Sequence, residues 1–206
     1  LILPRENNFC VQRPSSLGGP GGEGVYVGTE DCLYLDIIAP SKKQLEPLPV
    51  MFWIHGGALR FGSGDNYLPD GILSKGKILV TINYRLGELG FFAHPSINNS
   101  EEEFKTNFGL LDQIKALHWV RENIEKFGGD PSNITIFGES AGGHNVYSLL
   151  VSEKANKLFH KAIAMSGYTT SISTIDAYKP KKKSSTSNFS SNNIVNKILK
   201  DQSQSR

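Results

Sequence analysis

The stretch that decides the fold is Ile134-Thr135-Ile136-Phe137-Gly138-Glu139-Ser140-Ala141-Gly142. Its first four residues are β-branched or aromatic, which is typical of a strand buried on both faces of a sheet. A helix is expected over 141–152, so the middle of the stretch is a strand-to-helix turn. The pentapeptide at 138–142 matches G-x-S-x-G, in which small neighbours let a serine hydroxyl stand exposed on a strained turn above a sheet. We therefore interpret Ser140 as a nucleophile.

Further strands and helices alternate on both sides of this turn. Short apolar runs predict strands at 33–38, 50–54, 78–82 and 161–165. Residues 108–127 have helical periodicity, and the Gly-Gly-Asp-Pro segment at 128–131 is expected to end that helix. Apolar strands that alternate with helices predict an α/β fold, in which flanking helices cover a mainly parallel sheet.

A second glycine turn, His55-Gly56-Gly57-Ala58, directly follows the strand at 50–54. Backbone N–H groups on a turn with few side chains can hold the oxyanion of a tetrahedral intermediate. Gly57 and Ala58 would supply two such donors, and Ala141 a third. Alone, this segment is better explained as a glycine turn at a strand end. Here, however, two such turns each follow a strand of the sheet, in the order along the chain that a single catalytic mechanism requires. Their joint occurrence favours the functional interpretation.

Length and composition bound the class of protein. The chain has 206 residues, of which 38% are hydrophobic and 10% aromatic, as in a globular domain with a core. A net charge of +2 is too small to favour nucleic acid or an anionic membrane surface. No run approaches the ~20 apolar residues of a membrane span. No histidine and cysteine spacing indicates a metal, and no cofactor is expected.

The two cysteines and the sequons bear on the cellular compartment. Cys10 and Cys32 flank a segment rich in turn-forming residues. A disulfide there would remove roughly 3 kcal/mol of unfolded-chain entropy, and two unpaired buried thiols are the alternative. N-x-S/T sequons occur at Asn98, Asn133 and Asn188. Although sequons also arise by chance, they favour a secreted or secretory-pathway glycoprotein. The N-terminal residues 1–5 lack the features of a signal peptide.

Several motifs occur in a fixed order along the chain. They are EDCLYLDI (30–37), WIHGGA (53–58), NYRLG (83–87), NFGLLDQ (107–113), FGGDP (127–131) and ITIFGESAGG (134–143). Over roughly residues 8 to 167 the chain resembles the type-B carboxylesterase and lipase family, the cholinesterase-like α/β-hydrolases. The Gly-Gly-Ala form of the earlier turn looks more like the insect-type esterases of that family.

The resemblance implies roles for individual residues. Ser140 would be the nucleophile, and Gly57, Ala58 and Ala141 would form the oxyanion hole. Cys10 would pair with Cys32. The substrate implied is a small-molecule carboxylic ester, with no nucleic-acid partner, and neither the individual ester nor the oligomeric state follows from the sequence.

Two departures from the family pattern limit what the resemblance implies. Family members place an acid and then a histidine far downstream of the serine, whereas this chain ends 66 residues after Ser140. The pattern also fades after Gly167. We therefore expect a partial hydrolase domain at 1–167 and a divergent Ser/Lys/Asn-rich tail at 168–206, poorly ordered except for one short helix near 194–199. A truncated gene model or an aberrant splice form would look like this.

The remaining candidate residues are less informative. His144 follows Ser140 by one helical turn, but a nucleophile at such a turn points away from its own helix, so His144 is a weak candidate base. His55 is interpreted as structural, and His94, His118 and His160 as surface or loop residues. Glu139 would line the site and tune its field, or else be an inert acidic neighbour.

Three functional hypotheses follow. The leading one is a serine carboxylesterase that works through an acyl-enzyme on Ser140. Without a base only ~10³–10⁴-fold catalysis over water remains, so the chain alone is expected to be nearly inactive. The alternative is a non-catalytic, neuroligin-like adhesion module, whose partner binding would persist after Ser140→Ala. A third is a fragment without function, which would unfold broadly and bind dyes of apolar surface.

Overall fold

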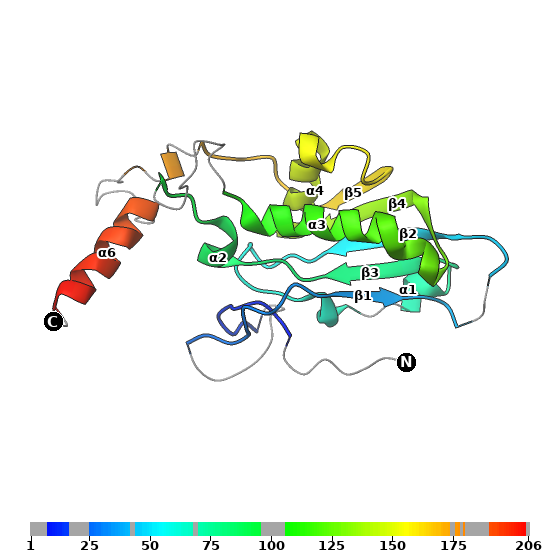
Figure 1. Ribbon diagram of the computed structural model, residues 1–206, viewed down its shortest axis with the longest axis horizontal. Helices are drawn as coiled ribbons and strands as arrows, with labels where there is room; N and C mark the ends of the chain where they lie inside the picture. The colour runs from blue at the N-terminus through cyan, green and yellow to red at the C-terminus, as the bar shows by residue number, and fades with distance from the viewer. Residues whose placement is uncertain are drawn as a thin grey trace.

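The computed structural model describes residues 8–16, 25–41, 44–67, 70–95, 106–173, 176–177, 179 and 190–204. These residues form a five-stranded sheet in the order β1-β3-β2-β4-β5 (Figure 1). The strands are β1 (Leu35–Ile38), β2 (Leu48–Ile54), β3 (Ile78–Ile82), β4 (Gly129–Glu139) and β5 (Lys161–Met165). β1 runs antiparallel to β3, and the other neighbouring strands are parallel. The mainly parallel α/β sheet predicted from the sequence is confirmed.

Helices connect the parallel strands. The α-helices are α1 (Asp70–Leu73), α2 (Gly87–Phe91), α3 (Phe108–Asn123), α4 (Ala141–Val151) and α6 (Ser191–Gln204). Single 3₁₀ turns lie at Gly64–Asn66, Ile124–Phe127 and Glu153–Ala155. α3 and α4 pack on each other and on β4, whereas α6 lies apart from the sheet, beyond α2 (Figure 1). The parallel strands that these helices connect therefore all belong to one sheet.

The core lies between the central strands and helices α3 and α4. All five residues of β3 are buried, which explains why that strand has no polar alternation. From the helices, Leu117 and Val120 on α3 and Val146 and Leu149 on α4 are buried in the same cluster. This packing fixes the end of β4, where α4 begins.

β4 differs from the strand expected at 134–137, because it already begins at Gly129. Gly128 adopts a left-handed conformation with φ 80° and ends the preceding 3₁₀ turn. Its carbonyl then accepts a hydrogen bond of 2.8 Å from the Leu48 N–H, at the start of β2. The segment expected only to stop a helix thus also starts the strand.

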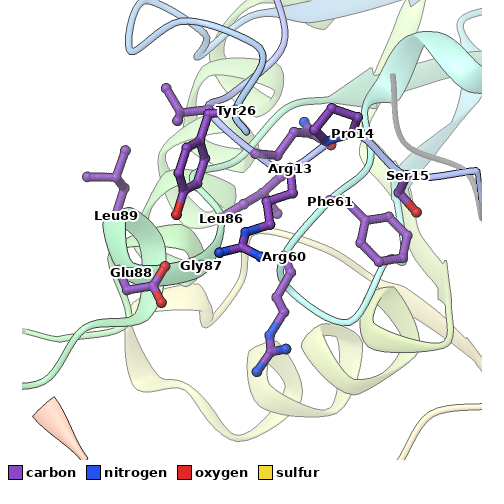
Figure 2. A pocket seen from close by; sticks show the side chains of 12 residues that line it. Arg13, Pro14, Ser15, Tyr26, Arg60, Phe61, Leu86, Gly87, Glu88 and Leu89 are labelled. Carbon is purple, nitrogen blue, oxygen red and sulfur yellow. The ribbon is translucent and has the colours of Figure 1, made fainter. Parts of the chain in front are cut away.

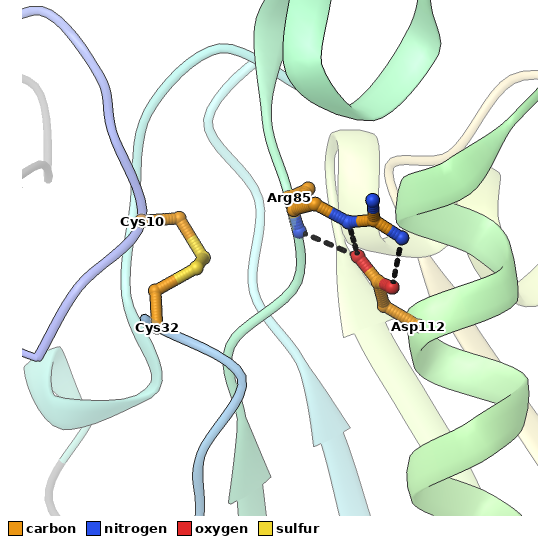
Figure 3. A network of polar contacts seen from close by, with 4 residues as sticks. All are labelled: Cys10, Cys32, Arg85 and Asp112. Carbon is orange, nitrogen blue, oxygen red and sulfur yellow. Dashed lines mark hydrogen bonds and ion pairs between the residues drawn. A yellow bond between two sulfur atoms is a disulfide. The ribbon is translucent and has the colours of Figure 1, made fainter. Parts of the chain in front are cut away.

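The first described segments are joined by a disulfide between Cys10 and Cys32, whose Cα atoms are 4.8 Å apart (Figure 3). The pairing that the family resemblance implied is confirmed. Both cysteines are buried. Inside the loop, Gln12 and Val27 exchange two backbone hydrogen bonds of 2.9 and 2.8 Å. The two sides of the disulfide loop are therefore paired with each other.

An ion pair joins the segment between β3 and α2 to α3 (Figure 3). The Arg85 guanidinium donates from Nε to Asp112 Oδ2 at 2.8 Å and from Nη2 to Oδ1 at 2.6 Å. The Arg85 backbone N–H also donates to Asp112 Oδ2, at 3.0 Å. The Asp112 side chain is 6% exposed. Hydrogen bonding to Asp112 raises the pKa of Arg85.

Several sequence predictions remain outside this description or untested by it. Asn98 and Asn188 lie outside the described residues, whereas the Asn133 side chain is half-buried and accepts a hydrogen bond of 2.7 Å from Lys161 Nζ. The helix expected near 194–199 forms as α6 and is longer than expected, and the division at 167 stays a prediction. Among the described residues, no helix is long and apolar enough to cross a membrane, and no group of side chains is suited to a metal ion.

Candidate active site

Ser140 occupies the turn between β4 and α4 with φ 56° and ψ −120°. Such a conformation is sparsely populated for a residue with a Cβ and costs about 1–3 kcal/mol, which the surroundings must offset. The Ser140 N–H donates to the Met165 carbonyl at the end of β5 (2.9 Å), and its carbonyl accepts from the His144 N–H (3.0 Å). The turn is therefore clamped from the neighbouring strand and from its own helix.

The glycines beside Ser140 are required by close backbone contacts. A Cβ on Gly138 would lie 2.5 Å from the Gly142 carbonyl carbon, and one on Gly142 would lie 2.1 Å from the Ile54 carbonyl oxygen. Neither position can hold a side chain unless the backbone moves. Backbone atoms therefore approach closely around Ser140, where the end of β2, the end of β4 and the start of α4 meet.

The glycine turn after β2 is strained as well. Gly57, Ala58 and Leu59 have φ values of 103°, 54° and 61°. A Cβ on Gly57 would collide with the Phe61 carbonyl oxygen, at 1.9 Å. The Gly57 carbonyl accepts hydrogen bonds from the Arg60 and Phe61 N–H groups, at 2.9 and 3.1 Å. The Gly57 carbonyl is therefore used inside the turn. We call residues 56–61 the oxyanion turn, after the role that the sequence predicts for it.

The oxyanion turn lies directly beside Ser140. A Cβ on Gly56 would be 3.3 Å from the Ser140 Cβ and 2.8 Å from the Glu139 carbonyl oxygen. Within the described part of the chain, no hydrogen bond uses the N–H of Gly57, Ala58 or Ala141. Ala141 is the first residue of α4, where the helix leaves its N–H groups unpaired and its dipole is positive. The two loops that meet at Ser140 thus contain three backbone N–H groups without a hydrogen-bond acceptor among the described residues.

His55 holds the start of the oxyanion turn. The imidazole is fully buried, and its Nδ1 lies 2.7 Å from the Gly56 carbonyl oxygen, which can only accept, so Nδ1 carries the proton. The ring stacks on Tyr84 with centroids 4.4 Å apart, and the Tyr84 hydroxyl donates to the His55 carbonyl at 2.8 Å. Burial lowers the pKa of His55 to about 4, although the hydrogen bond to Gly56 opposes this. His55 is neutral at pH 7 and structural.

Gln12 holds the residue that follows the turn, a role that the sequence did not predict. Its Oε1 accepts from the Gly62 N–H at 2.7 Å, and its Nε2 donates to the carbonyls of Gly62 (3.0 Å) and Cys10 (2.9 Å). The side chain is buried. Nothing near Gln12 in the sequence signals these contacts, because its partner is 50 residues away.

Tyr67 is a second residue that sequence reasoning missed. Its ring lies 4.6 Å from that of Trp53, centroid to centroid. Burial raises the pKa of the Tyr67 hydroxyl, a hydrogen bond with the Gly56 backbone lowers it, and the Glu139 charge raises it again. Glu139 itself is exposed at the end of β4. Tyr67 and Glu139 therefore both lie next to Gly56.

No imidazole is placed to act on Ser140. All five histidines lie among the described residues, and none of them is hydrogen-bonded to the Ser140 side chain. His144 Nδ1 lies 2.6 Å from the Tyr168 carbonyl, and the ring stacks on that of Tyr168. His94 contacts Asn192, and His160 accepts from the Ile134 N–H. His118 is exposed on α3.

Comparison with known proteins gives consistent matches. A sequence model of the carboxylesterase family matches residues 5–199. The chain is 51% identical over 142 residues to the para-nitrobenzyl esterase of Bacillus subtilis, covering 68% of this chain and 28% of that protein. It is 49% identical over 143 residues to carboxylesterase 1E of Rattus norvegicus, covering 68% and 24%.

Solved structures agree with the sequence matches. A thermophilic PNB esterase superposes with a TM-score of 0.69 at 46% identity, covering 80% of this chain and 34% of that one. The juvenile hormone esterase of Manduca sexta, solved with OTFP covalently attached, has a TM-score of 0.60 at 38% identity, covering 68% and 26%. The chain thus spans about a quarter of the curated relatives and about a quarter to a third of these structures.

Proposed function

The chain belongs to the carboxylesterase family, and we propose that it carries the nucleophile and the oxyanion-binding amides of a serine carboxylesterase. The proposal rests on one observation, the closeness of the two loops: a Cβ added at Gly56 would lie 3.3 Å from the Ser140 Cβ. Ser140 Oγ would attack the ester carbonyl while the N–H groups of Gly57, Ala58 and Ala141 bind the oxyanion. Expulsion of the alcohol leaves an acyl group on Oγ, and water then releases the acid.

Proton transfer is the slow part of this proposed reaction. Attack requires a base to take the Ser140 proton, and deacylation requires a base to activate water. Because none of the five histidines contacts Ser140, both steps would proceed without an imidazole. We therefore expect the 206-residue chain to turn esters over slowly, and expect an acyl group, once formed, to persist on Ser140.

The environment of the protein is proposed from the same features. A buried disulfide between Cys10 and Cys32 suits an oxidising compartment. Together with the sequon at Asn133, this supports a glycoprotein of the secretory pathway. Mass spectrometry of the protein from its native source, before and after deglycosylation, would test this. An unmodified Asn133 with both thiols free would contradict it.

The acyl group can be sought directly. We would incubate the chain with p-nitrophenyl acetate, quench in acid and map acetylation by peptide mass spectrometry, with Ser140→Ala as the control. The expected result is slow acetylation of Ser140 that outpaces acetylation of every other serine. Acetylation spread over surface lysines and serines, with none at Ser140, would refute the proposed function. Rapid turnover would instead refute the claim that no base acts on Ser140.

A further inference from the structure

A cavity of about 490 Å³ lies next to the oxyanion turn (Figure 2). Three parts of the chain line it. Residues 11–15, which follow Cys10, and Tyr26 come from the disulfide loop, Arg60 and Phe61 come from the oxyanion turn, and residues 86–89 come from the start of α2. The cavity therefore shares a wall with the turn that meets Ser140.

Charge in this cavity is unbalanced. Arg13 and Arg60 each contribute a guanidinium group to the lining and Glu88 contributes a carboxylate, and the Arg60 side chain points away from Arg13 and Glu88 (Figure 2). Among the described residues, none of these three side chains takes part in an ion pair. Arg13 instead lies over the Tyr26 ring, 5.6 Å from its centroid. Both guanidinium groups therefore keep donors for an incoming anion.

The rest of the lining contains the polar residues Gln12 and Ser15 together with apolar side chains. Phe61 and Pro14 are half-buried, Leu86 is buried, and Leu89 is 45% exposed at the rim. Walls of this kind suit a ligand that has a hydrocarbon body as well as a charge. The lining carries two arginines and one glutamate, so it has a surplus of one positive charge. That surplus matches a singly charged carboxylate better than a doubly charged anion.

We propose that this cavity binds the carboxylate of a hemiester of a dicarboxylic acid, an ester whose acyl chain ends in an ionised acid. This inference rests on the proposed function, because it places the ester group at Ser140. Arg60 follows Ala58 by two residues, so their Cα atoms are separated by at most roughly 8 Å of chain. Because Arg60 also lines the cavity, an ester group held at the amide of Ala58 would have its acyl chain directed towards this cavity.

Binding can be measured without turnover in the Ser140→Ala chain. We would titrate it calorimetrically with monomethyl glutarate, and with dimethyl glutarate as an uncharged ligand of the same backbone. The hemiester is expected to bind about tenfold more tightly than the diester, since one hydrogen-bonded charge contact contributes at least that factor. Arg13→Gln or Arg60→Gln would each weaken hemiester binding by about five- to tenfold and leave the diester unchanged. Glu88→Gln would strengthen hemiester binding.

Matched controls separate a local site from net charge. Lys75→Gln and Glu122→Gln change the charge by the same amounts at exposed positions outside the cavity. Their effect on hemiester binding should stay below twofold, with circular dichroism confirming that each variant folds. Equal binding of hemiester and diester, or a Lys75→Gln effect as large as that of Arg60→Gln, would overturn the inference. Because binding is measured without Ser140, a failure to acetylate Ser140 would refute the proposed function and not this site.

Discussion

His55 makes the stability of this fold depend on pH. Burial lowers its pKa from 6.5 to about 4. Between these two pH values the imidazole is mostly protonated in the unfolded chain and mostly neutral in the folded chain. The contribution of neutral His55 to the free energy of unfolding is therefore fully present above pH 6.5 and is lost as the pH falls towards 4. A difference of about 2.5 pH units corresponds to about 3 kcal/mol.

Urea unfolding at several pH values between 7 and 4 tests this prediction. The His55→Gln chain should be less stable than the parent at pH 7 and should lack this part of the pH dependence, whereas His118→Gln, at an exposed position, should keep it. Identical pH profiles for the parent and His55→Gln would contradict the assignment, because the carboxylates common to both would then explain the whole slope.

Gly142 is predicted to tolerate no side chain. The methyl group of alanine would lie 2.1 Å from the Ile54 carbonyl oxygen, so the start of α4 would have to move away from β2. We expect Gly142→Ala to lower the free energy of unfolding by about 1–3 kcal/mol. Gly71→Ala is the matched control, since no atom lies within 4 Å of the added methyl group and its expected effect is neutral or slightly stabilising. Equal unfolding midpoints for the two variants would contradict this account.

Local pattern was enough to locate the loops of Ser140 and Gly57, because both follow apolar strands and both need glycine. It could not locate Gln12 or Tyr67. Each of these acts through a contact that depends on how distant segments fold together, and neither residue type is unusual at its position.

The ion pair between Arg85 and Asp112 ties the segment that follows β3 to α3 (Figure 3). Removing Asp112 leaves the Arg85 backbone N–H and two guanidinium donors without their acceptor. Because Arg85 is 38% exposed and can turn to water, we expect Asp112→Ala to cost about 2–3 kcal/mol, less than a fully buried pair. Glu125→Ala, at an exposed position in the adjoining 3₁₀ turn, is the control. Thermal unfolding that does not distinguish the two variants would refute this role.

Strand positions were the most predictable part of the fold. β3 and β5 have the bounds expected from their apolar runs. The start of β4 was missed because its first residues, Gly129 to Asn133, are turn formers, and the pairing of Leu48 with Gly129 draws them into the sheet. α1 and α2 have four and five residues, too few to show helical periodicity.

The sheet as a whole exposes apolar side chains along β5, at one end of the strand order. Ile163 and Met165 are 46% and 38% exposed, and α4, which packs on β5, exposes Leu150 and Val151 at its C-terminal end. Surfaces of this kind associate or bind dyes. We expect Ile163→Thr with Met165→Thr to reduce dye fluorescence and concentration-dependent association, followed by sedimentation. Ile172→Thr, exposed outside the sheet, should change neither, and an unchanged double variant would contradict the prediction.

The most direct test of the central claim is the rate at which a fluorophosphonate labels each serine of the folded chain, followed by peptide mass spectrometry. The claim is that the folded sheet presents Ser140 to the amides of the oxyanion turn. Because one oxyanion donor is typically worth ~10²–10³ in rate, Ser140 should label at least about a hundredfold faster than the other serines, and this preference should vanish in urea. Labelling of Ser140 at the rate of its neighbours, or a rate unaffected by unfolding, would contradict the account.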